Sequence, residues 1–394
     1  MITKIHISDF KSIVNLTIEL GRFNVIIGEN GCGKTNILEA ISFASAASQG
    51  VLGNETLGGK LRLVPRDFMF PAFDGETRTR AIEITVTEPP KLNTMVACIY
   101  DDKQDKWVNF GDMIEDAKIT DLLGKVLDIL NTNTDEQVSP KLDFEQLNKY
   151  IKDYDFPKIK ETVPQFYNLV KSKMLEKPAL NDYVIYSPEE TQLRRFSDES
   201  QILPLGRRGE GLFQYLKRLA SESPETIFKI QEGLSMLDWF DGFKIPEDLM
   251  SNEYKLDVAD KYLKTTLHYF DQRSTNEGFL YLLFYLTLFT SIHTPNFFAI
   301  DNIESSFNPK LCTRLVSSLA SLAKENEKQV IVTTHNPYIL DGLNLNDDSQ
   351  RLFVVRRNKD GHTILRRIKP VEDSNMKLSE VWMKGFIGGL PDNF

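Results

Sequence analysis

The sequence predicts an α/β protein with two lobes, an antiparallel β lobe and a parallel α/β lobe, together with a helical insertion. Residues 2–8, 13–20 and 22–27 have the alternation of short strands, and the third strand leads directly into a glycine-rich loop and a helix. Between residues 274 and 334, helices alternate with apolar strands, as in a parallel sheet. A plain doubly wound domain places its glycine-rich loop after the first strand, so a sheet that begins with antiparallel strands before its loop favours a protein with two lobes.

The size and composition suit a globular protein with a substantial core. The chain has 394 residues, 41% of them hydrophobic, which is enough for one large domain or two ordinary ones. The start of the chain lacks the apolar run of a signal peptide, and the longest apolar run, 278–289, is too short to span a bilayer. We therefore expect a cytoplasmic protein without a membrane partner. Cys32, Cys98 and Cys312 lie far apart, which argues against a disulfide framework and a cysteine zinc site.

The net charge of −9 argues against a surface that coats nucleic acid indiscriminately. A local basic groove stays open, because five basic pairs could converge on one face or could simply be solvated. These pairs are Arg194-Arg195, Arg207-Arg208, Lys217-Arg218, Arg356-Arg357 and Arg366-Arg367.

The stretch from Gly28 to Thr35 predicts a site for a nucleoside triphosphate. It reads Gly-Glu-Asn-Gly-Cys-Gly-Lys-Thr and matches the pattern G-x-x-x-x-G-K-[ST]. Gly28, Gly31 and Gly33 allow the backbone to turn successive N–H groups onto phosphate oxygens. Lys34 would meet the β- and γ-phosphates, and Thr35 would offer its hydroxyl to Mg²⁺, at the positive end of the following helix. ATP and Mg²⁺ are the expected ligands.

The middle of the chain predicts a change of character near residue 112. From there to about residue 178 the sequence is charged and helix-like, and prolines break it at Pro140, Pro157 and Pro164. We interpret 112–180 as a helical insertion between an N-terminal lobe, 1–111, which carries the phosphate loop, and a C-terminal lobe, 181–394. The further predicted elements are strands at 81–87, 94–100 and 183–186, and helices at 212–220 and 225–237.

A second group of candidate site residues follows two apolar strands in the last third of the chain. Asp301 ends the strand 297–300, where a carboxylate can hold the Mg²⁺ opposite Thr35, although a lone aspartate more often caps a turn. His335 follows the strand 329–334, where an imidazole can reach the γ-phosphate or the attacking water, although such a histidine is usually polar surface. The phosphate loop upstream favours the magnesium and catalytic roles.

Five short motifs, in order along the chain, resemble those of ABC-class ATPase heads related to SMC, RecF and the OLD family. The motifs are Phe10-Lys-Ser-Ile13 for the first strand, the G-x-N-G-x-G-K-[ST] loop, Asn276-Glu-Gly278 for the signature loop, Asp301-Asn-Ile-Glu304 with Asn308-Pro309 for Walker B and the D-loop, and Thr334-His335-Asn-Pro337 for the switch histidine. The resemblance implies a homodimer or higher even-numbered oligomer, in which ATP on one subunit's phosphate loop is closed over by the signature loop of the other. It further implies nucleotide contacts from Asn30, Asn36, Lys11, Ser12, Asn276 and Gly278, and a catalytic group drawn from Asn302, Glu304 and His335.

Two positions depart from the pattern of these heads. Asn276 stands where a serine is usual, two residues before the signature glycine, and its amide can still donate to a phosphate. Asn302 stands where a glutamate commonly activates water, and an amide cannot act as a base. Either Glu304 supplies the carboxylate, or hydrolysis is slow and the closed dimer is long-lived.

The length of the chain distinguishes among the related ATPases that it resembles. An insertion of roughly 65 residues spans at most about 50 Å as a helical hairpin, which excludes long SMC arms. The 59 residues after His335 are too few for a TOPRIM nuclease domain, and they end in a tail, 378–394, that closes with Gly-Gly-Leu-Pro-Asp-Asn-Phe. The leading hypothesis is a slow ATPase of bacterial anti-phage defence that controls a separately encoded effector, such as a nuclease. The alternatives are a RecF-like repair clamp on DNA and a nucleotide-binding scaffold with little hydrolysis.

Overall fold

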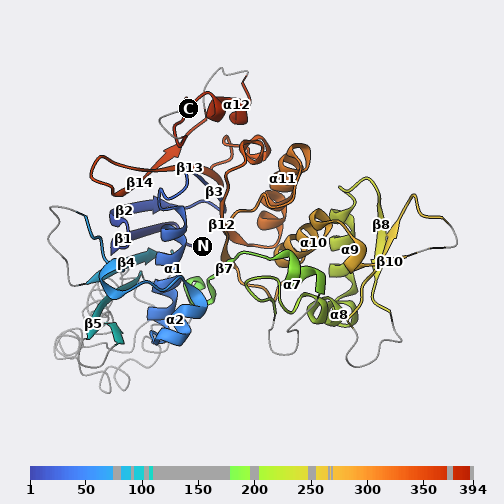
Figure 1. The fold of residues 1–394 in the computed structure, drawn as a ribbon, viewed down its shortest axis with the longest axis horizontal. Coiled ribbons are helices and arrows are strands. Elements are labelled where there is room, and N and C mark those ends of the chain that lie inside the picture. Colours follow the sequence, from blue (N-terminus) through green and yellow to red (C-terminus); the bar gives the residue numbers. More distant parts are fainter. Residues whose placement is uncertain are drawn as a thin grey trace, which may run out of the picture.

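The structure is a computed structural model that describes residues 1–73, 81–89, 93–101, 106–109, 178–195, 204–246, 254–264, 267, 269–370 and 376–390. The predicted helical insertion, 112–180, lies outside these ranges except for its last three residues. Within the described ranges, the α/β class and the two kinds of sheet are confirmed (Figure 1).

The first sheet is antiparallel and has the strand order β2-β1-β4-β5-β6. Its strands are β1 (Lys4–Phe10), β2 (Ile13–Glu19), β4 (Ile82–Thr87), β5 (Thr94–Asp101) and β6 (Lys106–Asn109). Alternate residues of β4 are buried, as expected for a sheet with one face on the core. The predicted antiparallel lobe is therefore present.

The second sheet has the order β14-β13-β3-β12-β11-β7, and all its neighbours are parallel except β13 and β14. Its strands are β3 (Phe23–Ile27), β7 (Val184–Tyr186), β11 (Phe297–Ile300), β12 (Gln329–Thr333), β13 (Gln350–Arg357) and β14 (Thr363–Ile368). The strand before the phosphate loop thus pairs with strands from the C-terminal half of the chain. Because parallel strands end at the same edge, the segments after β3, β11 and β12 meet there.

Helices cover both faces of the second sheet. Helix α1 (Lys34–Ser48) packs with Ile26, Ile331 and the antiparallel sheet in one core. Val25 and Val332 face the other core, which contains α10 (Glu277–Thr290) and the other helices of that side. Burial on both faces explains why all five residues of β3 are buried and four of them are apolar.

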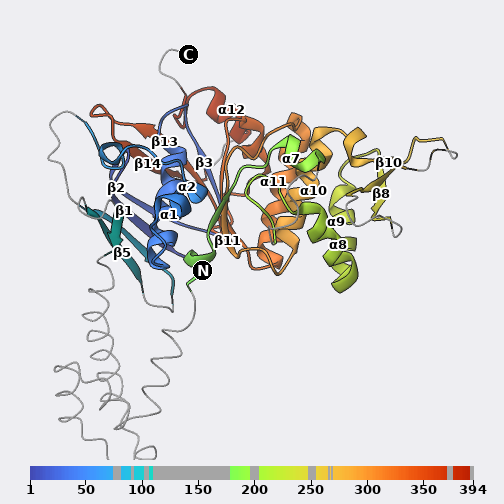
Figure 2. The same ribbon diagram turned by 60° about the horizontal axis from the view of Figure 1, so that its bottom comes forward.

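Most of the remaining helices pack in the same core as α10, whereas α2 (Asn54–Lys60) packs in the core of α1 (Figures 1 and 2). The other helices are α7 (Glu190–Arg195), α8 (Leu212–Glu222), α9 (Pro224–Leu234), α11 (Pro309–Glu325) and α12 (Leu378–Met383). The 3₁₀ helices are η1 (Arg66–Phe68), η2 (Ala179–Asp182), η3 (Gln272–Ser274) and η4 (Pro337–Gly342). A small antiparallel sheet contains β8 (Phe240–Lys244), β9 (Asp257–Asp260) and β10 (Phe270–Asp271). Across the described ranges, no helix combines the length and the hydropathy that a bilayer crossing requires.

Candidate nucleotide-binding site

The predicted phosphate loop connects β3 to α1 and has the backbone that its glycines allow. Gly33 adopts a φ of 108° directly before α1, and a β-carbon there would lie 2.1 Å from Thr363 Oγ1. Gly28 adopts a φ of 153°, and a β-carbon there would lie 2.3 Å from the carbonyl oxygen of Val355. Side chains are therefore excluded at both ends of the loop, which leaves its backbone in close contact with β13 and β14.

Lys34 lies at the start of α1 and turns back into the loop. Its Nζ donates to the carbonyl oxygens of Gly28 (2.8 Å) and Glu29 (2.9 Å), and the side chain is buried. Burial lowers the pKa of Lys34, while the nearby Asp301 and Glu304 carboxylates oppose that shift. The ammonium group is thus held within the loop by neutral carbonyls, where a phosphate oxygen would be a stronger acceptor.

A chain of hydrogen bonds fastens the loop to the first strands and to β14. Asn36 Nδ2 donates to Ser12 Oγ (2.6 Å), Ser12 Oγ lies 2.7 Å from Thr363 Oγ1, and Thr363 Oγ1 donates to the carbonyl oxygen of Cys32 (3.0 Å). Because the two end bonds fix their donors, Ser12 donates to Thr363. Ser12 and Asn36 therefore lie beside the loop, and their contact with a nucleotide stays a prediction.

Two supporting residues were missed by the sequence reasoning. Thr363 completes the chain described above, and Arg357 donates from Nε to the carbonyl oxygen of Gly31 (3.0 Å). Both are on the β13–β14 hairpin, more than 300 residues beyond the loop. The sequence names Arg357 only as part of a basic pair and gives no signal at Thr363, so only the fold identifies their contacts with the loop.

Lys11 has a different immediate partner from the one expected. Its ammonium group lies 2.7 Å from Glu39 Oε2 and donates to the carbonyl oxygen of Arg62 (2.8 Å), and both members of the ion pair are buried. Burial lowers the pKa of Lys11, and the Glu39 carboxylate partly restores it. The structure therefore places Lys11 against α1, and its contact with a nucleotide stays a prediction.

The two residues predicted to hold magnesium come together at the carboxyl edge of the sheet. Thr35 Oγ1 donates to Asp301 Oδ2 at 3.4 Å, although the two residues are 266 positions apart. Thr333, at the end of β12, donates to Asp301 Oδ1 and accepts from the backbone N–H of Asn302 (2.9 Å). A hydroxyl and a carboxylate suit Mg²⁺, which commonly takes one or two protein oxygens and completes its shell with phosphate and water.

Glu304 and His335 also come together. Glu304 Oε1 accepts from the backbone N–H of His335 (2.7 Å), and the other oxygen, Oε2, is buried without a partner among the described residues. Burial and then the Lys34 charge lower the pKa of His335, which favours its neutral form. Asn302, with a φ of 58°, directs the chain around this turn. A half-satisfied carboxylate beside a neutral imidazole is an arrangement that can accept a proton.

The signature loop opens on a cavity of its own. Asn276 caps α10 by accepting from the backbone N–H of Phe279 (2.9 Å), and Glu277 accepts from Ser306 Oγ (2.6 Å). The cavity next to it measures about 780 Å³ and is lined by Asn276, Gly278, Trp239 and three cationic side chains, Arg194, Lys310 and Arg314. No described residue of the phosphate loop lines this cavity, so the predicted signature loop lies apart from the phosphate loop within one chain.

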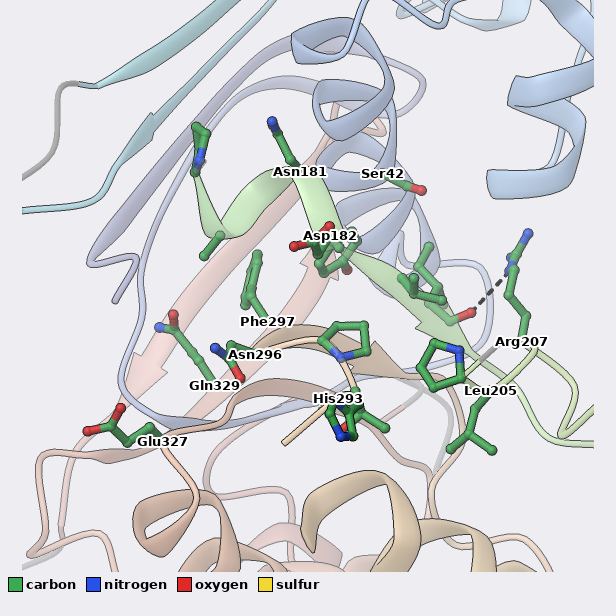
Figure 3. Close-up of a pocket in the computed structure, with 18 of the residues that line it drawn as sticks. Ser42, Asn181, Asp182, Leu205, Arg207, His293, Asn296, Phe297, Glu327 and Gln329 are labelled. Carbon is green, nitrogen blue, oxygen red and sulfur yellow. Dashed lines mark hydrogen bonds between the residues drawn. The ribbon is translucent and has the colours of Figure 1, made fainter. Parts of the chain in front are cut away.

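A larger cavity, of about 900 Å³, lies at the other edge of the second sheet (Figure 3). Its lining includes Phe297 and Gln329, the first residues of β11 and β12, together with His293 and Arg207. The phosphate loop follows the carboxyl end of β3, which is parallel to β12. This cavity therefore lies at the opposite edge of the sheet from the phosphate loop.

The basic pairs are divided between distant parts of the molecule. Figure 1 shows α7 and α8 near α10, and β14 on the opposite side of the molecule. Arg207 Nε donates to the carbonyl oxygen of Ile185 (3.1 Å), and Arg366 Nη2 donates to that of Ile387 (2.7 Å). These arginines stabilise local structure, and their arrangement gives no support to a single basic groove.

The strand–loop–helix unit, the hydroxyl–carboxylate pair and the mixed sheet define a class of protein, the P-loop ATPase heads. Residues 4–237, more than half of the chain, match the family model of an AAA domain. The chain belongs to this family, and it is an ABC-type ATPase head of the kind shared by SMC, RecF and OLD proteins. The predicted resemblance is confirmed.

Solved structures of SMC heads support this assignment at the level of the fold. One is an SMC head bound to the C-winged helix domain of ScpA, with a TM-score of 0.52 and 14% identity over 93% of this chain and 97% of that chain. Another is the Smc head domain with an extended coiled coil bound to the C-terminal domain of ScpA, derived from Pyrococcus furiosus, with a TM-score of 0.51 and 15% identity over 98% of each chain.

Curated relatives share shorter stretches. The OLD nuclease of Thermus scotoductus is 36% identical over 91 residues, which are 23% of this chain and 15% of that protein. The RecF protein of Shewanella loihica, a DNA replication and repair protein, is 42% identical over 62 residues, or 14% of this chain and 17% of that protein. The chain thus spans less than a fifth of each relative's length.

Proposed function

We propose that the protein is an ATP-binding and ATP-hydrolysing switch in which two copies close on two nucleotides. The main support is the separation of the half-sites. The phosphate loop, Thr35 and Asp301 gather at one edge of the sheet, whereas Asn276 and Gly278 border a cation-lined cavity that no described residue of the loop enters. A signature loop of a second copy is what would complete the site.

Each residue of the first half-site has a role in the proposal. Lys34 would leave the carbonyl oxygens of Gly28 and Glu29 for the β- and γ-phosphates, which are stronger acceptors because they carry charge. Thr35 and Asp301 would hold Mg²⁺, which neutralises charge on the phosphates when bound. Asn36 and Ser12 keep the start of α1 in register with the loop.

Glu304 is the proposed general base. Its Oε1 is fixed by the His335 backbone N–H, which leaves the unpartnered Oε2 to accept a proton from water. The neutral imidazole of His335 would orient that water or the γ-phosphate. Asn302 carries an amide at the position where related heads have their base, so we propose slow turnover and a long-lived closed dimer.

We further propose that closure controls a separately encoded effector, a nuclease, in anti-phage defence. The similarity to an OLD nuclease supports this direction. The second candidate function is a RecF-like clamp in DNA repair, which the similarity to RecF supports and the scattered basic pairs do not. A nucleotide-binding scaffold is the third, and it rests on Asn302.

The test compares three variants with the wild-type protein in ATP turnover and in mass by light scattering, with and without ATP and Mg²⁺. Lys34→Ala should lose ATP binding and stay monomeric. Glu304→Gln should lower turnover by at least tenfold and accumulate the ATP dimer, because the amide cannot take the proton. Asn302→Glu should raise turnover.

Three results would contradict parts of the proposal. Unchanged turnover in Glu304→Gln would remove Glu304 from the chemistry. A wild-type protein that binds ATP and stays monomeric would refute the dimeric switch. Duplex DNA binding with a steep salt dependence, in the absence of a co-purifying neighbouring gene product, would favour the repair clamp over the defence switch.

A further inference from the structure

The C-terminal tail, residues 378–390, packs on the nucleotide-binding edge of the second sheet. It begins with α12 and continues through a turn rich in glycine. Val381, Trp382 and Ile387 are buried in the same core as Val354 of β13. Figures 1 and 2 both place α12 close to the end of the molecule that carries β13. The tail is therefore an integral part of the head.

One end of the tail touches the phosphate loop directly. A β-carbon on Gly389 would lie 3.4 Å from Gly28 Cα, 3.0 Å from Val354 Cγ1 and 3.6 Å from Trp382 Nε1. Gly28 cannot carry a side chain, because a β-carbon there would meet the carbonyl oxygen of Val355. The two glycines therefore bring the backbone of the tail against the first residue of the loop, and Arg366 holds this turn through the carbonyl oxygen of Ile387.

The other end of the tail is tied to the segment that follows the switch histidine. The backbone N–H and the hydroxyl of Ser379 both donate to the Asp341 carboxylate, at 2.9 Å and 2.8 Å. Asp341 lies in η4, which begins two residues after His335. One short segment thus connects the phosphate loop to the element that follows His335.

We propose that the C-terminal tail is a strap that positions the phosphate loop relative to the His335 segment and responds to nucleotide at the loop. Lys34 donates to the carbonyl oxygen of Gly28, the residue that Gly389 contacts. A triphosphate that draws Lys34 away changes the hydrogen bonding of Gly28 and, through Gly389, the environment of the tail. This inference rests on the proposed nucleotide binding and adds Gly389, Ser379 and Asp341 as positioning residues.

The structure offers a matched pair of glycines for the test. Gly389 and its neighbour Gly388 have φ values of 82° and 73°, so alanine strains the backbone similarly at both. Only the alanine at 389 also meets other atoms, because nothing lies within 4 Å of a β-carbon at 388. Gly389→Ala should raise the Kd for ATP with Mg²⁺ at least fivefold and lower kcat, whereas Gly388→Ala should change each less than twofold. Equal effects of the two variants would overturn the proposal.

Trp382 provides an independent readout. Its indole Nε1 is buried, lacks a partner among the described residues, and adjoins Gly389. Replacing Trp107 and Trp239 by phenylalanine leaves Trp382 as the only tryptophan. Its emission should change on addition of ATP with Mg²⁺, and the midpoint should equal the Kd measured by equilibrium dialysis.

Two outcomes of the fluorescence experiment separate the strap from the proposed function. ATP uptake in dialysis without a change in Trp382 emission would overturn the strap and leave nucleotide binding intact. No ATP uptake by the wild-type protein would overturn both. Lys34→Ala, in the same single-tryptophan protein, should abolish uptake and the emission change together.

Discussion

The buried Lys328 predicts that the free energy of unfolding depends on pH in the alkaline range. The side chain is fully buried, and its Nζ donates to the Thr294 carbonyl oxygen (2.8 Å), the Thr294 hydroxyl (3.0 Å) and Asn296 Oδ1 (3.3 Å). These acceptors are neutral. Burial therefore lowers the pKa of Lys328 to about 8, from an ordinary value of 10.5.

Proton linkage gives the direction in which the free energy of unfolding changes with pH. Between pH 8 and pH 10.5 the unfolded chain holds the Lys328 proton more tightly than the native protein does, so the free energy of unfolding rises with pH across this window. The free energy of unfolding can rise by at most about 1.36 kcal/mol per pH unit from one titrating group. At pH 8, where native Lys328 is half protonated, the slope is near half of this limit, and it approaches the limit at higher pH. Integrated from pH 8 to about pH 9.5, Lys328 contributes a gain of about 1.5 kcal/mol.

The perturbation is Lys328→Met, which keeps the length of the side chain and removes its titration. Urea unfolding at several pH values between 8 and about 9.5 measures the free energy of unfolding for each protein. The free energy of unfolding of the wild type minus that of Lys328→Met should rise by about 1.5 kcal/mol over this range. Lys324→Met, at an exposed lysine on α11, is the control and should run parallel to the wild type. Parallel curves for wild type and Lys328→Met would contradict this expectation, because they would mean that burial does not lower the pKa of native Lys328.

Two further predictions concern the candidate site. Thr333→Val removes the hydroxyl that joins Asp301 to the Asn302 backbone. It should lower the free energy of unfolding by about 1–3 kcal/mol, measured by urea unfolding, and weaken Mg²⁺-dependent ATP binding, measured by calorimetry. An unchanged stability and affinity would show that Asp301 needs no such support. Gly33→Ala places a β-carbon 2.1 Å from Thr363 Oγ1 and should abolish ATP binding, whereas Gly53→Ala, where nothing lies within 4 Å, should leave it unchanged, so retained ATP binding in Gly33→Ala would contradict the loop geometry.

Much of the site was predictable because its parts are local patterns. The phosphate loop is one continuous octapeptide, and its glycines and Lys34 have roles that depend on backbone chemistry alone. Asp301 and His335 follow apolar strands, and strands of a parallel sheet end at one edge, so the approach of Asp301 to Thr35 followed from the pattern. The order of the motifs also predicted the family.

Other features depended on contacts that no local pattern encodes. The two lobes could be predicted, but not that β3 would leave the antiparallel strands before it and pair with β12 and β13. The buried pairing of Lys11 with Glu39 follows from how α1 packs against the turn after β1. Ion pairs of this kind need three-dimensional neighbours, which the spacing of charges along the chain does not give.

Local patterns in the sequence are enough to predict the strand–loop–helix unit, the ligand class expected at the phosphate loop and the order of the strand-end residues, because each arises from residues close together in the chain. The supporting contacts become visible only in the folded chain: Thr333 donates to Asp301, Thr363 donates to the carbonyl oxygen of Cys32, and Gly389 lies against Gly28. Those contacts join segments separated by 32, 331 and 361 positions. Their free energy comes from burial and hydrogen bonding that exist only once the sheets have assembled.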